Sequence, residues 1–257
     1  GDYGYPVYSA EARKGGYDDA NPYVKGTRDP RFYRDIIYHG APYRNNKNES
    51  KTINTASGSD KIGATNATTT GYYLRKFQQE SWNKSGNFSI NAPAIWRLPE
   101  FIYIYAEACN ELGEDIDEAY KLVNTVRERS FMKPMPPEVK TNRQLMREYI
   151  QRERRVELFY ENNRYWVSRL YLQPGDYSTT TNVKATEWPY PKDLRQSHGM
   201  KPVEDPNGKI EVNGKKYRME RFVVEDNRVF SAPKSYLWPI LQEELKRCPS
   251  LVQNPGW

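Results

Sequence analysis

Apolar side chains recur at intervals of three and four residues between residues 97 and 160, and this spacing constrains the fold more than any other feature of the chain. Such intervals place side chains on one face of a helix. Gly113 stands at the usual place for a C-terminal helix cap, so we predict a helix that ends there. The apolar positions on its predicted face are Leu98, Phe101, Ile102, Tyr105, Ala108, Cys109 and Leu112.

A second helix is predicted directly after Gly113. Asp115 and Glu118 have the spacing of a capping box, in which each side chain bonds the backbone N–H of the other residue. This pattern predicts a helix that begins close to Asp115. The positions expected to face inward are Ala119, Leu122, Val123 and Val126.

A third helix is predicted from Thr141 to about Tyr160, with Thr141 and Gln144 as its capping box. Three prolines in residues 131–140 prevent the preceding helix from running into it. Short turns between amphipathic helices are typical of antiparallel helix pairs, the unit of an α-solenoid. One pair and a third helix do not establish a repeat, and the sequence shows no fixed-period self-similarity.

The rest of the chain is predicted to form loops and short strands. Residues 31–38 and 71–77 are expected to be short regular segments, and Asn213-Gly214 is a dipeptide favoured in two-residue hairpin turns. We expect a single domain of residues 1–257, with a loop-rich region on the ligand side at 1–96, a helical core at 97–171, and loops, a hairpin and a tail at 172–257.

Composition and charge exclude several classes of function. The formal net charge is +6 and the basic residues are scattered, whereas nucleic-acid-binding proteins concentrate them in a stripe. No run of 18 apolar residues is present, so a transmembrane helix is not expected. Cys109 and Cys248 match no metal or disulfide spacing and are predicted to be free thiols. With only two histidines, neither a metal site nor a cofactor is predicted.

Glu153 and Glu157 lie one turn apart in the apolar stripe of the third predicted helix. Two carboxylates on one face are compatible with an acid/base pair, as in glycoside hydrolysis. Buried carboxylates are otherwise stable when they are paired and hydrogen-bonded, which arginine does through two parallel bonds. We favour this structural ion-pair network, for which the candidate partners are Arg127, Arg129, Arg154 and Arg164. No nucleophile elbow, phosphate-binding glycine loop or zinc spacing supports an enzyme.

Aromatic residues make up 14% of the chain and include 21 tyrosines, many of them outside the predicted helices. Rings on loops either fill a core or pack on the apolar face of a sugar, whose hydroxyl groups then bond neighbouring polar side chains. The composition leaves both alternatives open.

Several sequence blocks, in chain order, resemble the SusD/RagB family of outer-membrane nutrient-binding lipoproteins of Bacteroidetes. The resemblance extends over nearly the whole chain. The blocks are GYDDANPYVKGTRDPRFYRDIIYHG at 16–40, which contains the RDPRF motif, GYYLRKF at 71–77, RLPEFIYIYAEACNELG at 97–113, NTVRERS at 124–130, ERRVELFYENNRYW at 153–166 and YLWPILQEELKRCPSLVQNPGW at 236–257.

This resemblance implies a mainly α fold of tetratricopeptide-like helix pairs with extensive irregular loops and short β-hairpins. It implies a non-enzymatic protein on the outer face of the outer membrane, which captures a glycan and passes it to a SusC-like TonB-dependent transporter. RagB-type members imply an alternative ligand, a peptide or glycoprotein, and a scaffold that only docks the transporter is a further alternative. The block with Glu153, Arg154 and Glu157 is a fold signature of the family, which agrees with the structural network.

The chain resembles the C-terminal half of the family pattern. Family members usually have an N-terminal half with a lipidated cysteine and several solenoid helices, so we expect the lipid anchor to lie outside this chain. Without neighbouring helices, residues 98–112 or 145–160 are expected to expose an apolar patch or to cover it by self-association. Family ligand sites draw on aromatic and polar residues of that N-terminal half and of loops just before the RDPRF motif. The second source extends the glycan-binding hypothesis to Tyr3, Tyr5, Tyr8, Tyr17 and Trp82.

Overall fold

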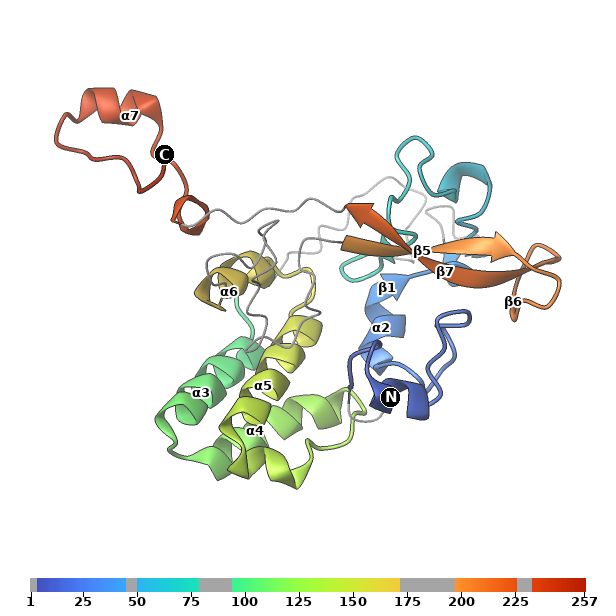
Figure 1. Cartoon of the computed structure of the whole chain (residues 1–257), viewed down its shortest axis with the longest axis horizontal. Helices are drawn as coiled ribbons and strands as arrows, with labels where there is room; N and C mark the ends of the chain where they lie inside the picture. Colours follow the sequence, from blue (N-terminus) through green and yellow to red (C-terminus); the bar gives the residue numbers. More distant parts are fainter. Residues whose placement is uncertain (1–3, 45–49, 79–93, 172–196, 226–232) are drawn as a thin grey trace, which may run out of the picture. The chain divides into compact units, whose positions relative to one another are not determined.

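The structure is a computed structural model that describes residues 4–44, 50–78, 94–171, 197–225 and 233–257 (Figure 1). The chain divides into two compact units, residues 1–161 with 198–224, and residues 162–197 with 225–257. The first unit holds most of the helices and all the paired strands described below, and this confirms the prediction of a helix-rich chain with short strands.

Three helices enclose the largest apolar core of the first unit. α3 spans Leu98–Leu112, α4 spans Ile116–Arg129 and α5 spans Arg143–Glu157, and α3 packs against both of the others. Gly113 ends α3 with a left-handed φ of 78°, as its position predicts. The buried core residues are Tyr103, Ala106, Cys109, Ala119, Val123, Val126, Met135, Val139, Met146, Tyr149, Ile150 and Leu158.

The face of α3 that packs is not the one predicted from the spacing. Tyr103, Ala106, Cys109 and Asn110 are buried, and of the predicted stripe only Cys109 belongs to this group. α3 is apolar around most of its circumference, so the spacing alone does not select a face. The expected uncovered apolar patch is present on this helix. Its large exposed members are Leu98, Phe101, Ile104, Tyr105 and Leu112.

The N-terminal caps differ in detail from the predicted capping boxes. Asp115 is the N-cap of α4, but its backbone is left-handed (φ 50°) and its side chain caps no N–H. The N-cap of α5 is Asn142, which accepts a hydrogen bond from the backbone N–H of Leu145 at 3.0 Å. Thr141 instead ends the 3₁₀-helix η2, Pro137–Thr141. α5 therefore begins two residues later than predicted and ends at Glu157 rather than near Tyr160.

The segment before α3 carries two short helices and two pairs of short strands. α2, the helix that begins within the RDPRF motif, is capped by Asp29, whose side chain accepts from the N–H of Arg31. β1 pairs with β4 and β2 pairs with β3, both antiparallel. The elements are α1 (Ala10–Lys14), α2 (Pro30–Asp35), β1 (Ile36–Ile37), β2 (Pro42–Arg44), β3 (Ser50–Thr52), the 3₁₀-helix η1 (Gly58–Asp60) and β4 (Tyr73–Leu74).

The predicted hairpin is confirmed in a three-stranded sheet with the order β5-β7-β6. β6 (Ile210–Val212) and β7 (Lys215–Glu225) are antiparallel, and Val212 pairs with Lys215 across the turn. Asn213 and Gly214 both have positive φ, 52° and 75°, which is the requirement of a type I′ turn. β5 spans Ser197–Glu204.

The second unit contains α6 (Asn163–Tyr171), the 3₁₀-helix η3 (Lys234–Tyr236) and α7 (Gln242–Arg247). Within this unit the rings of Tyr165 and Trp238 lie 5.8 Å apart. The indole N–H of Trp257 bonds the carbonyls of Lys234 and Leu237, which fixes the irregular tail. Within the ranges given above, no helix has both the length and the apolar character needed to cross a bilayer.

His39 is a fully buried titratable group of the first unit. Its Nδ1 accepts a hydrogen bond from the backbone N–H of Thr55 at 3.1 Å, and the ring meets that of Tyr217 edge to face at 4.7 Å. Burial lowers the pKa of His39 from 6.5 to about 4. The folded state therefore binds fewer protons than the unfolded state between these two pH values.

We expect the free energy of unfolding to be fully retained above pH 6.5 and to fall by about 2–3 kcal/mol as the pH drops to 4, at about 1.4 kcal/mol per unit of pKa shift. His39→Asn keeps an acceptor for Thr55 but does not titrate, so it removes this slope. Urea unfolding at pH 7, 6, 5 and 4 measures the effect, with His198→Gln as the control. An unchanged slope in His39→Asn would contradict the assignment.

Candidate functional site

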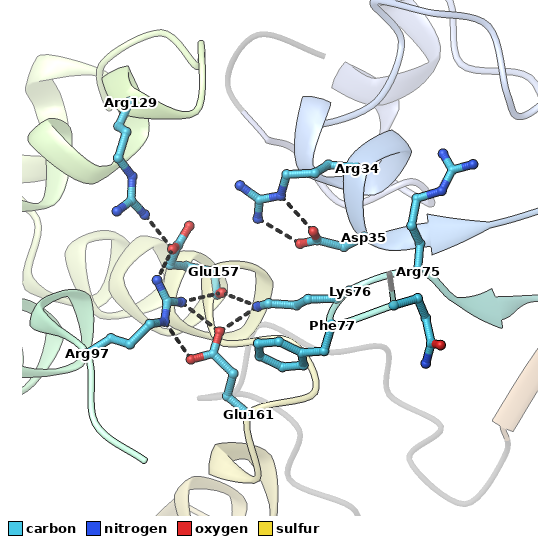
Figure 2. A pocket seen from close by; sticks show the side chains of 10 residues that line it. Arg34, Asp35, Arg75, Lys76, Phe77, Arg97, Arg129, Glu157 and Glu161 are labelled. Atoms are coloured by element: carbon cyan, nitrogen blue, oxygen red, sulfur yellow. Dashed lines mark hydrogen bonds and ion pairs between the residues drawn. The ribbon is translucent and has the colours of Figure 1, made fainter. Parts of the chain in front are cut away.

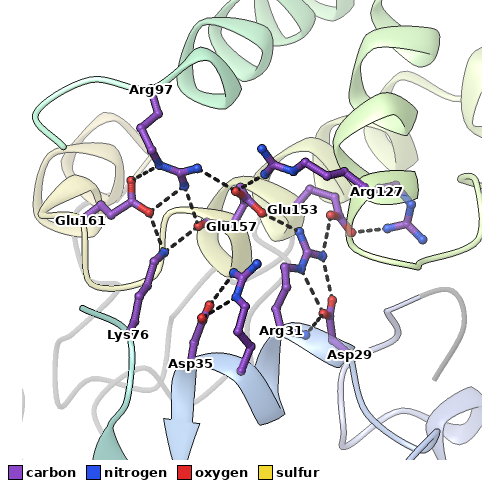
Figure 3. Close-up of polar contacts among 11 residues, drawn as sticks. Asp29, Arg31, Asp35, Lys76, Arg97, Arg127, Glu153, Glu157 and Glu161 are labelled. Atoms are coloured by element: carbon purple, nitrogen blue, oxygen red, sulfur yellow. Dashed lines mark hydrogen bonds and ion pairs between the residues drawn. The ribbon is translucent and has the colours of Figure 1, made fainter. Parts of the chain in front are cut away.

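A buried ion-pair network joins α2 to α5 inside the first unit (Figure 3). Arg31, on α2, donates from Nη2 to Glu153 Oε2 at 2.8 Å and from Nη1 to Glu157 Oε2 at 3.4 Å. The same guanidinium bonds Asp29 through Nε and Nη2 at 2.9 and 2.7 Å. Because Glu153 and Glu157 are one helical turn apart on α5, a single planar guanidinium reaches both carboxylates.

The arginines predicted from sequence occupy three different places. Arg127 pairs with Glu153, and Arg129 pairs with Glu157. Arg154 instead pairs with Glu100 and Glu107 of α3, at 3.3 Å each. Successive residues point about 100° apart around a helix, so Arg154 faces α3 while its neighbour Glu153 faces α2 and α4. Arg164 lies on α6, in the second unit.

The surrounding cations keep Glu157 and Glu161 ionised. Burial alone raises the pKa of Glu157, but Arg129, Arg97 and Arg31 outweigh that effect and hold the pKa below its ordinary value. Burial also raises the pKa of Glu161, but hydrogen bonds from Arg97 and Lys76 outweigh this effect and hold that pKa below its ordinary value. A general acid of a glycosidase needs a raised pKa. Neither carboxylate meets that requirement.

A cavity of about 760 Å³ opens beside this network (Figure 2). α2 supplies one side, the segment that follows β4 supplies another, and Glu157 with Glu161 forms the side nearest α5. The lining residues include five cations and three carboxylates. They are Arg34, Asp35, Arg75, Lys76, Phe77, Gln78, Arg97, Arg129, Glu157 and Glu161.

The inner side of the cavity is held by mutually paired charges. Glu161 bonds Lys76 at 2.5 Å and Arg97 at 2.6 Å, and Arg97 also reaches Glu157 at 3.0 Å. Lys76 and Arg97 each also donate a hydrogen bond to the backbone carbonyl of Glu157. These bonds attach the segment after β4 to the end of α5 and fix the cavity wall, as Figure 2 shows.

The outer part of the cavity carries half-exposed arginines. The side chains of Arg34 and Arg129 are 54% and 53% exposed. Arg34 bonds Asp35 of its own helix, through Nε at 2.6 Å and Nη2 at 2.8 Å. Arg75 is anchored by the backbone carbonyls of Tyr33 and Pro42.

Of the predicted sugar-binding rings, the three that the structure describes, Tyr5, Tyr8 and Tyr17, do not line this cavity. Tyr17 is only 6% exposed, and the guanidinium groups of Arg13 and Arg28 lie 5.2 and 5.7 Å from its ring centroid. Tyr17 therefore does not present an open ring face, contrary to the expectation for a platform residue. Tyr5 is half-buried and Tyr8 is exposed, while Tyr3 and Trp82 lie outside the described residues.

Sequence reasoning selected only Arg129 and Glu157 among the residues of the cavity, and assigned both to the structural network. The signal that the sequence offers is the presence of basic residues inside two of the resemblance blocks, Arg34 in the block at 16–40 and Arg75 and Lys76 in the block at 71–77. Among the described residues no group of three His, Cys, Asp or Glu is suited to hold a metal ion. Cys109 is buried, Cys248 is exposed, and both are free thiols.

Comparison with known proteins gives a family and a fold. The sequence profile of the SusD family matches residues 3–257. The fold is similar to that of a SusD-like protein from Bacteroides fragilis, with a TM-score of 0.67 at 23% sequence identity. The match covers 94% of this chain and 41% of that protein, so the chain spans less than half the length of this relative. No curated protein sequence matches significantly.

Proposed function

The chain belongs to the SusD family, and from this premise we propose that it is a non-catalytic surface protein that captures an oligosaccharide and passes it to a SusC-like TonB-dependent transporter. The observation that carries the proposal is the family match over residues 3–257. The cavity of Figure 2 supports it as a place where a polar ligand can bind, since it is wide, open and lined by hydrogen-bond donors on fixed elements.

The state of the carboxylates supports binding rather than hydrolysis. Glu153 is held by Arg31 and Arg127, and Glu157 is held by three arginines. A glycosidase needs one protonated and one free carboxylate at the scissile bond. Carboxylates that are already saturated with charge-assisted bonds act as structural anchors instead.

The proposed location is the outer face of the outer membrane, where a lipid anchor attaches the protein. Tetratricopeptide-like helix pairs provide the scaffold in this account, and α3–α5 are its described representatives. A RagB-type peptide ligand and a scaffold that only docks the transporter are the competing functions. Tyr3, Tyr5, Tyr8 and Trp82 are retained as proposed additional contacts for a sugar.

A glycan and peptide array, probed with the full-length protein, separates these functions. We expect retention on at least one oligosaccharide and none on the peptides, together with co-purification of a TonB-dependent transporter from detergent-solubilised outer membranes. Binding to peptides alone would support the RagB-type function. Co-purification without any ligand would support the scaffold, and either result would contradict the proposal.

A further inference from the structure

We propose that the cavity of Figure 2 selects acidic oligosaccharides, and that Arg34 and Arg129 bind a carboxylate or sulfate group of the sugar chain. This inference rests on the proposed function and adds the chemical class of the ligand. The two arginines come from separate elements, α2 and the end of α4, and both line the same cavity.

The charge balance of the cavity favours an anion. Among the described residues five cations line it against three carboxylates, and the described partners behind the wall do not change this surplus, since Arg31 and Arg127 are matched by Asp29 and Glu153. A concave site whose walls carry an excess of one sign concentrates the opposite charge. A neutral sugar would leave the excess unmatched.

The donors of the two arginines are incompletely used. A guanidinium has five N–H donors. Among the described residues, Arg34 donates only from Nε and Nη2, both to Asp35, and Arg129 donates only from Nη2, to a Glu157 oxygen that Arg97 also bonds. The remaining N–H groups belong to half-exposed side chains at a cavity. Planar guanidinium groups match the geometry of carboxylate and sulfate oxygens.

The wall behind these arginines is rigid, which makes the arrangement suitable for recognition. Lys76 and Arg97 are committed to Glu161 and to the end of α5, and Asp35 is buried beneath Arg34. The positions of Arg34 and Arg129 are therefore set by bonds to residues that are themselves fixed.

Isothermal titration of the full-length protein tests the proposal with oligosaccharides of matched length that are neutral, uronate-containing or sulfated. We expect the acidic chains to bind about tenfold more tightly than the neutral chain, with the difference shrinking at 0.5 M NaCl. Arg34→Gln and Arg129→Gln should each weaken the acidic chains about tenfold and change neutral binding little. Arg143→Gln is the matched control, because this arginine is equally exposed and pairs with Glu111 away from the cavity.

Gln78 gives a second test that breaks no ion pair. Gln78 is exposed and lines the cavity, so Gln78→Glu should weaken acidic binding and Gln78→Lys should strengthen it, each by about threefold. Equal affinity for neutral and acidic chains, or acidic binding that none of these variants changes, would overturn the proposal while glycan binding stands. If no oligosaccharide binds at all, the proposed function fails as well.

Discussion

Replacing Glu153 with Gln is expected to lower the free energy of unfolding by about 3–5 kcal/mol. The side chain of Glu153 is almost fully buried and binds Arg31 and Arg127, which are equally buried. Removing its charge leaves the buried guanidinium of Arg127 with no carboxylate partner among the described residues, and it leaves Arg31 with Asp29 and Glu157 alone. The energy required to bury the Arg127 charge unpaired dominates the effect. Urea unfolding followed by circular dichroism measures it.

The chain offers a matched control for this variant. Glu111 also faces two arginines, Arg143 and Arg147, but it is 39% exposed. Water solvates the arginines when this carboxylate is neutralised, so Glu111→Gln should cost about 0–1 kcal/mol. Equal losses from Glu153→Gln and Glu111→Gln would show that burial does not set the energetics of the network.

Replacing Gly71 with Ala is expected to cost about 2–5 kcal/mol of stability. Gly71 has a left-handed φ of 83°, and a Cβ at this position would lie 2.0 Å from the carbonyl oxygen of Met200. The neighbouring residue Thr70 accepts a backbone hydrogen bond from Met200 at 2.9 Å, so the two segments cannot separate without losing it. The energy cost of the left-handed backbone and the energy cost of the steric overlap with Met200 therefore add.

Gly113→Ala isolates the conformational part of this cost. Gly113 has nearly the same φ, 78°, but a Cβ there would meet nothing within 4 Å. The expected loss is about 1–2 kcal/mol. Thermal and urea unfolding of both variants give the difference, and a Gly71→Ala variant no less stable than Gly113→Ala would contradict the close approach to Met200.

Local signals in the sequence predicted the elements better than their contacts. Gly113 ended α3, and Asn213-Gly214 formed the hairpin turn, because each residue determines backbone geometry at its own position. The cap of α5 was misplaced by one residue because Thr141 and Asn142 are adjacent and both are good caps. The packed face of α3 was missed because nearly all its faces are apolar.

The network and the cavity depend on contacts that the sequence does not encode locally. Arginine partners were predicted for Glu153 and Glu157 because both carboxylates lie in an apolar stripe and are therefore expected to be buried. Arg31, a central partner, lies 122 residues away from Glu153 and was not among the candidates. Only the fold brings α2 beside α5. The same reason explains why Arg34 was not selected, although it stands three residues after Arg31.

Native mass spectrometry of the full-length protein with a panel of neutral and acidic oligosaccharides separates capture from hydrolysis, because it reports binding and turnover in one spectrum. We expect complexes whose mass is that of the protein plus an intact oligosaccharide, with no shortened chains after prolonged incubation. Shortened oligosaccharides, or the absence of a complex with every member of the panel, would contradict this expectation.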